Sequence, residues 1–287
     1  MIGAIIGDVI GSHYEGKIKK AKNKDFELFT PYSICTDDTI MTIAVGQAMV
    51  NTYQEKEISV IQNELIKEMQ RLGRLYPYSG YGKQFKYWLR EENPKPYNSY
   101  GNGSGMRVSS VAWLYDNLED VNKYAEITAS VSHNHPEGIK GACAIASAIY
   151  LASEKKSKDE IKKYIEEKFE YILKPISQIV EEESNYGASS QITVPIAIQA
   201  FLEGKDFEDV LRTAIFAGGD TDTIACMACS IAEVCYEIPN NLLEFAYSRM
   251  DLPLKKPLKN ILMLIKEKNK LNTNLKKVLE LLENENI

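Results

Sequence analysis

The sequence predicts an all-α fold. Many segments repeat apolar residues with the 3.6-residue period of a helix, and others are continuous runs of small apolar residues. Convincing runs that alternate polar and apolar residues, as β-strands do, are absent from the sequence. The 287 residues contain no internal repeat and no stretch typical of a linker, so we expect one compact domain over residues 1–287.

The expected helices follow one another along the chain. The first, over residues 2–12, should be fully buried, because Gly3, Gly7 and Gly11 share one face and would let another backbone approach closely. Residues 258–287 are rich in lysine and spaced leucine, and they predict one or two amphipathic helices on the periphery. The other helices are expected around the apolar run 40–50, ending at about 51, at 58–72, 85–89, from 106 onward, and at 121–131, 136–152, 159–172, 192–202, 207–216, 223–235 and 242–247.

Composition excludes several classes of protein. A net charge of −6 argues against general affinity for nucleic acid, although a helix start can still bind a small anion. No apolar run approaches the roughly 18 residues that a membrane span needs, and the first residues lack the basic start of a signal peptide, so we expect a cytoplasmic protein. The five cysteines are an odd number, and the Cys226–Cys229 pair has no second pair to complete a zinc site.

Two clusters of acidic residues and threonines each precede an apolar run. Carboxylates held at the starts of two buried segments repel one another unless a cation neutralises them. Carboxylates and hydroxyls offer only oxygen, which favours Mg²⁺, Mn²⁺ or Ca²⁺ over Zn²⁺. The clusters therefore predict a site for two ions, one for each aspartate pair. They are Thr36-Asp37-Asp38-Thr39 and Gly218-Gly219-Asp220-Thr221-Asp222-Thr223.

Each cluster also has a simpler interpretation. Asp and Thr are common helix N-caps, so Thr36–Thr39 alone is more typical of a capped helix. The second cluster is harder to explain in this way, because one cap needs one carboxylate and this turn contains two. Together, the two clusters favour a site.

Three further features are candidates with weaker signals. The glycine-rich residues 101–105 end a loop at 93–105 and would cradle a phosphate, although such sequences are more often simple turns. His133 and His135 are two residues apart and cannot share a helix face, which argues against a metal site but allows one to donate to an anionic or sugar ligand. By pattern alone, Glu15 is an ordinary exposed glutamate.

Five motifs in this order resemble the ADP-ribosylglycohydrolase family, the enzymes related to dinitrogenase reductase activating glycohydrolase. The resemblance covers residues 3 to about 240, and the last ~40 residues match poorly. The motifs are residues 3–11 followed by Glu15, Thr36–Thr39, Tyr100–Arg107, Ser132–Pro136 and Gly218–Thr223.

The resemblance implies a compact all-α fold with two Mg²⁺ or Mn²⁺ ions in a cleft. The implied metal ligands are Thr36, Asp37, Asp38, Asp220, Asp222 and Thr223, with Asp220 or Asp222 bridging the ions. Glu15 matches a mobile acid/base glutamate, and Asp37, Asp38 and Asp222 join it as implied catalytic residues. The implied substrate-binding residues, for the diphosphate and the neighbouring ribose, are Ser99, Tyr100, Gly101, Asn102, Gly103, Ser104, Met106 and His133, with Gly80, Tyr81 and Gly82 lining the ligand.

The expected function is a metal-dependent hydrolase that cleaves the glycosidic bond between ADP-ribose and a modified protein side chain or another conjugate. Nucleic-acid-linked ADP-ribose remains an alternative substrate, and no membrane partner is expected. Two other functions stay open: a metal-dependent nucleotide phosphohydrolase, and a catalytically silent binding or structural protein of the same fold. The linkage would be encoded in residues 16–33, 76–98 and 184–191.

Overall fold

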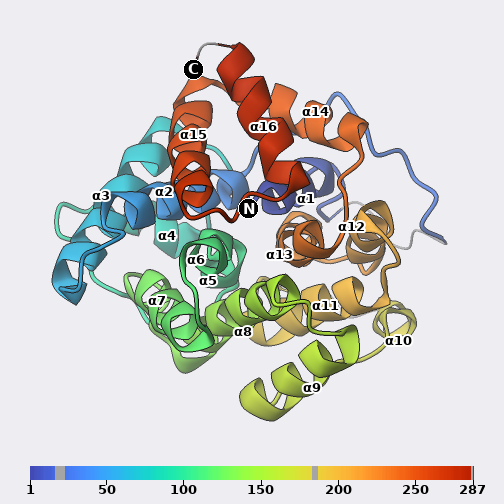
Figure 1. Cartoon of the computed structure of the whole chain (residues 1–287). Coiled ribbons are helices and arrows are strands. Elements are labelled where there is room, and N and C mark those ends of the chain that lie inside the picture. The colour runs from blue at the N-terminus through green and yellow to red at the C-terminus, as the bar shows by residue number, and fades with distance from the viewer. Residues whose placement is uncertain (17–22, 183–186, 286) are drawn as a thin grey trace.

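The computed structural model describes residues 1–16, 23–182, 187–285 and 287, and in these ranges it contains sixteen helices and no strand (Figure 1). The all-α prediction is therefore confirmed. Of the segments expected to encode the linkage, residues 17–22 and 184–186 lie outside the described residues.

The helices account for most of the chain. Their bounds are α1 (Ile2–Gly11), α2 (Asp37–Asn51), α3 (Ile58–Leu75), α4 (Lys83–Trp88), α5 (Gly103–Met106), α6 (Ser109–Leu114), α7 (Leu118–Ser130), α8 (Pro136–Ser153), α9 (Lys158–Phe169), α10 (Ile176–Glu181), α11 (Ser190–Glu203), α12 (Phe207–Phe216), α13 (Thr221–Cys235), α14 (Asn240–Ser248), α15 (Leu252–Glu267) and α16 (Thr273–Asn284).

Several boundaries differ from the expected ones for local reasons. The helix expected from residue 106 is two helices, because α5 already begins inside the glycine loop and ends before α6 starts. The helix expected at 159–172 ends at Phe169, where Glu170 adopts a left-handed conformation with φ 53°. Helix α10 has only six residues, too few to give a clear period, and the sequence did not predict it.

The C-terminal segment forms two amphipathic helices. Helix α15 starts at Leu252 and buries one face, including Leu258 and Ile261, which are 0 % exposed. It packs against α2 so closely that a Cβ added at Gly46 would lie 2.5 Å from Cδ1 of Ile261. Helix α16 then packs against α15, at the top of Figure 1.

Helices α1 and α13 lie side by side at the centre of the molecule (Figure 1). All ten residues of α1 are buried, as predicted. Its glycines face α13: a Cβ at Gly7 would lie 2.2 Å from the carbonyl oxygen of Ala225, and one at Gly11 would lie 2.7 Å from Cα of Asp222. The two backbones therefore touch, and this contact brings the C-terminal end of α1 against the acidic start of α13.

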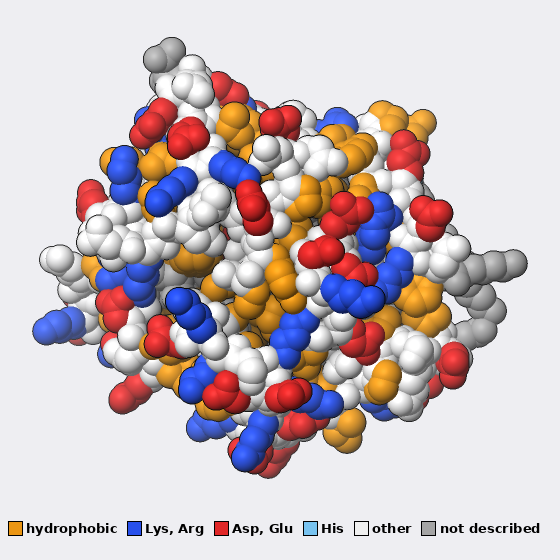
Figure 2. Space-filling model, turned by 45° about the vertical axis from the view of Figure 1, so that its right-hand side comes forward, with side chains coloured by type: hydrophobic (Ala, Val, Ile, Leu, Met, Phe, Trp, Pro, Cys, Tyr) orange, Lys and Arg blue, Asp and Glu red, His pale blue; other side chains and the backbone are white. Residues whose placement is uncertain are grey.

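Charges are mixed on the face in Figure 2, where acidic and basic side chains are interspersed. Among the described residues, no helix is long and apolar enough to cross a membrane.

The contact between α1 and α13 predicts a strong effect of one added methyl group. Gly7→Ala should lower the free energy of unfolding by about 3 kcal/mol, because the new Cβ overlaps backbone that cannot rotate away. Gly187→Ala is the control, since a Cβ there meets nothing within 4 Å, and it should change stability by less than about 0.5 kcal/mol. Thermal and denaturant unfolding measure both, and equal stability of the two variants would contradict this packing.

Candidate active site

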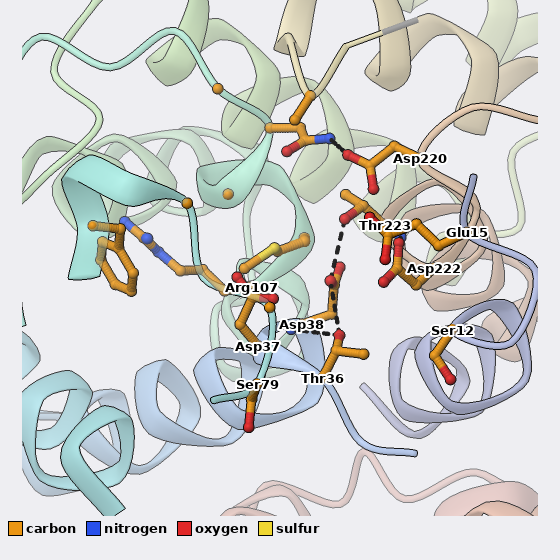
Figure 3. A pocket seen from close by; sticks show the side chains of 18 of the residues that line it. Ser12, Glu15, Thr36, Asp37, Asp38, Ser79, Arg107, Asp220, Asp222 and Thr223 are labelled. Carbon is orange, nitrogen blue, oxygen red and sulfur yellow. Dashed lines mark hydrogen bonds between the residues drawn. The ribbon is translucent and has the colours of Figure 1, made fainter. Parts of the chain in front are cut away.

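A pocket of about 800 Å³ opens where the acidic helix ends meet (Figure 3). The C-terminal end of α1 contributes Ser12 and the following Glu15, while the starts of α2 and α13 contribute their acidic clusters. Two loops, at 78–82 and 97–103, complete the wall together with His133. Both sequence clusters thus face one cavity, as the resemblance implied.

The buried carboxylate of Asp8, on α1, holds the start of α2. It accepts the Thr36 hydroxyl at 2.5 Å and two backbone N–H groups, those of Thr36 at 2.9 Å and Thr39 at 3.0 Å. These bonds satisfy donors that a helix start leaves free. Asp8 therefore fixes α2, and with it the Thr36 side chain, relative to α1.

Asp38 lies between the two threonines. Its Oδ2 is 3.3 Å from the Thr36 hydroxyl and 3.1 Å from the Thr223 hydroxyl, so it joins the starts of α2 and α13. Its Oδ1 is buried and has no hydrogen-bond partner among the described residues. A buried carboxylate oxygen without a partner is costly, which makes this atom a candidate cation ligand.

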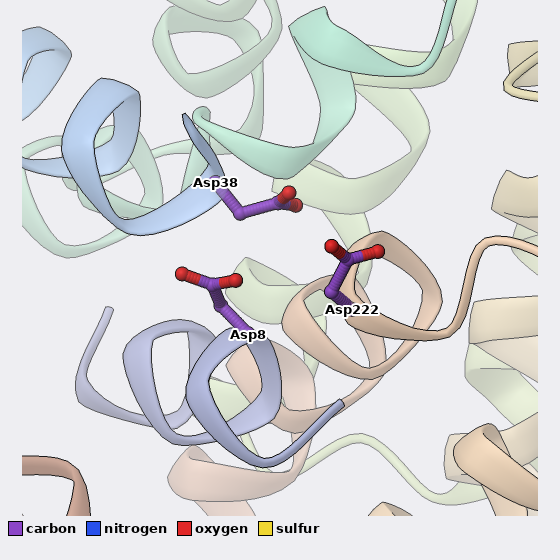
Figure 4. Close-up of side chains that lie close together, drawn as sticks. All are labelled: Asp8, Asp38 and Asp222. Carbon is purple, nitrogen blue, oxygen red and sulfur yellow. The ribbon is translucent and has the colours of Figure 1, made fainter. Parts of the chain in front are cut away.

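The carboxylates form two groups that share one residue. Asp8, Asp38 and Asp222 point toward one another from α1, α2 and α13 (Figure 4), with one oxygen of each within 4.8 Å of the others. Glu15, Asp220 and Asp222 form a second group by the same measure. Asp222 belongs to both, which is the position that a bridging ligand would need.

Burial and neighbouring charges raise the pKa of four aspartates in and beside the pocket. Burial raises the pKa of Asp8 to about 6, and burial together with the charge of Asp8 raises the pKa of Asp37 to about 8. Burial is also the main cause that moves the pKa of Asp38 and Asp222 well above the ordinary range, and the neighbouring aspartates add to it. The pocket therefore favours protons or a cation at these carboxylates.

Glu15 differs from the aspartates because it is exposed at the pocket mouth. Partial desolvation raises the pKa of Glu15, and the charge of Asp220 raises it further. Because Glu15 is exposed and lies beside the buried Asp222, it is able to exchange protons with solvent and with a bound ligand.

The glycine loop meets the acidic groups through Asn102. Its side-chain amide donates to Oδ2 of Asp220 at 2.7 Å. The glycine pair before Asp220 makes the other turn: Gly218 and Gly219 have φ of 77° and 76°, where a Cβ would be strained. This turn positions Asp220 at the start of α13.

Most of the residues expected in the site line the pocket. They are Glu15, Thr36, Asp37, Asp38, Gly80, Gly82, Ser99, Gly101, Asn102, Gly103, Met106, His133, Asp220, Asp222 and Thr223. Asp37 lies in neither carboxylate group; it faces Gly80, where an added Cβ would be 2.7 Å from its Oδ1.

Three expected ligand residues do not line it. Tyr100 is 57 % exposed and its ring contacts that of His135 edge-on. Tyr81 is buried against Phe85, and Ser104 is buried with its hydroxyl donating to the carbonyl of Gly138.

Two buried charged residues in and beside the pocket were not predicted from the sequence. In the sequence, Asp8 belongs to a segment that is otherwise apolar and predicted to be a buried helix. A single charged residue in such a segment is the one signal that could have indicated a functional role. Arg107 follows the glycine loop and lines the pocket, yet it is only 1 % exposed. A buried arginine has no signature in the sequence, because burial depends on distant elements.

Comparison with known proteins identifies relatives. ADP-ribosylhydrolase ARH3 of Homo sapiens is 27% identical over 315 residues, covering 82% of this chain and 84% of that protein. The protein of the same name from Xenopus tropicalis is 26% identical over 301 residues, covering 81% of this chain and 84% of its own length.

A solved structure has the same fold. It is described as an ADP-ribosylglycohydrolase-related protein complex, with a TM-score of 0.68 and 20% sequence identity, and the match covers 92% of this chain and 95% of that one. The sequence profile of the ADP-ribosylglycohydrolase family matches residues 1–251, which leaves out α15 and α16. The chain therefore belongs to the ADP-ribosylglycohydrolase family of enzymes.

Proposed function

We propose that this protein hydrolyses the glycosidic bond between ADP-ribose and a modified side chain of a protein substrate. The observation that carries the proposal is the shared pocket: a buried group of carboxylates, an exposed glutamate and a glycine loop line one cavity. Acidic groups alone would repel a diphosphate, so cations at these carboxylates are part of the proposal.

The residues of the pocket fit hard divalent cations, Mg²⁺ or Mn²⁺. The available ligand atoms are all oxygens, from Thr36, Asp38, Asp220, Asp222 and Thr223, with Asp37 at the edge. The unpartnered Oδ1 of Asp38 and the raised pKa values of Asp37, Asp38 and Asp222 support a site that a cation completes. When bound, such ions polarise substrate hydroxyls and lower the pKa of water.

Glu15 is the proposed acid/base. Hydrolysis at an anomeric carbon passes through an oxocarbenium-like state, which needs one group to remove a proton from water or to give a proton to the leaving group. A carboxylate oxygen of Glu15 lies within 4.8 Å of carboxylate oxygens of Asp220 and Asp222, yet the Glu15 side chain remains exposed to an incoming substrate. Partial burial and the charge of Asp220 raise the pKa of Glu15, which makes it easier to protonate than an ordinary exposed glutamate.

The glycine loop is the proposed diphosphate site. Gly101 and Gly103 lack side chains, which lets the imidazole of His133 pack against their backbone, and all three residues line the pocket. The buried Arg107 adds a positive charge to this wall. The pocket thus offers an anion site beside a cation site, which matches a diphosphate joined to a ribose.

The direct test is release of free ADP-ribose from defined conjugates. ADP-ribosylated serine peptides, arginine peptides and nucleic-acid ends are each incubated with Mg²⁺ or Mn²⁺ and analysed by mass spectrometry. Release is expected from at least one of the two peptides, and release from nucleic-acid ends alone would contradict a protein substrate. Release of AMP from ADP-ribose would instead identify a phosphohydrolase. Binding of ADP-ribose without turnover of any conjugate would identify a silent member of the family.

Replacing the proposed acid/base should separate catalysis from binding. Glu15→Gln should slow hydrolysis by about 10²–10⁴-fold without weakening ADP-ribose binding, because it removes proton transfer but leaves the ligand contacts. Glu154→Gln, at an exposed carboxylate outside the pocket lining, is the control and should keep full activity. Equal rates for Glu15→Gln and the wild type would rule out this role.

Metal should stabilise the fold more at high pH. The pKa values of Asp8 and Asp37 in the fold, about 6 and about 8, are higher than the pKa of aspartate in an unfolded chain. The metal-free fold therefore loses stability as the pH rises from the unfolded-chain value through these folded-state values. A cation favours the ionised forms and reverses this loss.

The Mn²⁺-induced rise in Tm should therefore be larger at about pH 8 than at about pH 5.5. Asp222→Asn, which removes the carboxylate shared by both groups, should reduce that rise at both values. A rise in Tm that is independent of pH and of Asp222 would contradict cation binding at these carboxylates.

A further inference from the structure

The buried Arg107 has an unusual set of partners. Its Nη2 donates to Oγ of Ser132 at 2.8 Å and to the carbonyl of Thr128 at 3.2 Å, and its guanidinium lies 5.8 Å from the centre of the Phe85 ring. Within the described parts of the chain, no carboxylate pairs with it. Figure 3 shows it across the pocket from Glu15.

The hydrogen bond from Arg107 to Ser132 determines which atom accepts the hydroxyl proton of Ser132. A guanidinium only donates, so Oγ of Ser132 must be the acceptor in that bond. The other partner of Oγ among the described residues is Nδ1 of His133, at 2.9 Å. The hydroxyl proton therefore has one acceptor available, the Nδ1 lone pair.

This order of donors fixes the protonation of His133. When Nδ1 of a neutral imidazole accepts a hydrogen bond, the proton is on Nε2. The opposite tautomer would make Oγ accept twice and leave the hydroxyl proton of Ser132 buried without a partner, which is costly. The ring is also kept neutral, since burial and the charge of Arg107 hold the pKa of His133 well below its ordinary value.

The free nitrogen of the ring faces the glycine loop. A Cβ at Gly103 would lie 2.9 Å from Nε2 of His133, and one at Gly101 would lie 3.6 Å from it. The rings of Phe85 and Tyr97 contact the imidazole edge-on, with centroids 6.4 Å and 5.8 Å away, and limit its rotation. His133 is 5 % exposed and lines the pocket, so its small open surface faces the ligand.

We propose that Arg107 and Ser132 are positioning residues that hold His133 as a neutral Nε2–H donor aimed at the anion held by the glycine loop. The identity of that anion, the diphosphate of ADP-ribose, rests on the proposed function. The relay from Arg107 through Ser132 to His133 is a property of the ligand-free fold. The two can therefore be tested separately.

The tautomer is measured directly by long-range ¹H–¹⁵N correlation spectra of protein labelled at histidine. The chain has only three histidines, and single replacements of His13 and His135 assign the signals. The wild type should show His133 protonated at Nε2 and not at Nδ1. Ser132→Ala should give a mixture of tautomers, and Ser132→Thr, which keeps the hydroxyl, should restore the single form.

Affinity follows in the same set of variants. With Mg²⁺ present, Ser132→Ala should weaken ADP-ribose binding in proportion to the fraction of His133 that loses its Nε2 proton, about two- to fivefold for a mixture of tautomers, and Ser132→Thr should recover it. Ser130→Ala is the matched control, because that hydroxyl only donates to the carbonyl of Glu126 on the outside of α7. It should change neither the spectrum nor the affinity.

Each outcome decides one part of the proposal. A wild-type His133 protonated at Nδ1, or a spectrum that Ser132→Ala leaves unchanged, would overturn the relay. An altered tautomer with unchanged ADP-ribose affinity would overturn the contact with the anion. A wild-type protein that has the expected tautomer but binds no ADP-ribose would overturn the proposed function and leave the relay standing.

Discussion

The contact between the backbones of α1 and α13 determines the rest of the structure. Because glycines remove the side chains between them, the Asp8 carboxylate of one helix and the Asp222 carboxylate of the other come within reach of a shared site. Asp8 then holds the start of α2 through three hydrogen bonds, which adds Asp38. A larger residue at the contact would separate all three carboxylates.

The pocket has two ends of opposite charge. At one end, carboxylates are crowded at the starts of α2 and α13, where helix dipoles compensate only part of the repulsion. At the other, Arg107 contributes a buried positive charge and His133 a neutral donor behind a loop without side chains. Asn102, which donates to Asp220, connects the two ends. A ligand with an anionic part and a hydroxyl-rich part would complement both.

The sequence predicted the features that depend on local patterns. Helical periods, the glycine face of α1 and both acidic clusters are visible within a few residues, and the order of five motifs connected them. It could not predict Asp8 or the relay through Ser132, because their partners are 28 and 25 residues away and meet only in the fold. The sequence also could not show that Asp38, and not Asp37, lies in the group with Asp8 and Asp222, because neighbouring aspartates differ only in the direction of their side chains.

In the proposed function, the acidic groups bind cations and these cations help to hold ADP-ribose. Calorimetric titration of ADP-ribose, with Mn²⁺ and then with excess chelator, tests it most directly in the wild type and in Asp222→Asn. Binding that requires Mn²⁺ and is lost in the variant is the predicted result. Binding of equal strength in chelator, or in the variant, would show that the carboxylates have another purpose.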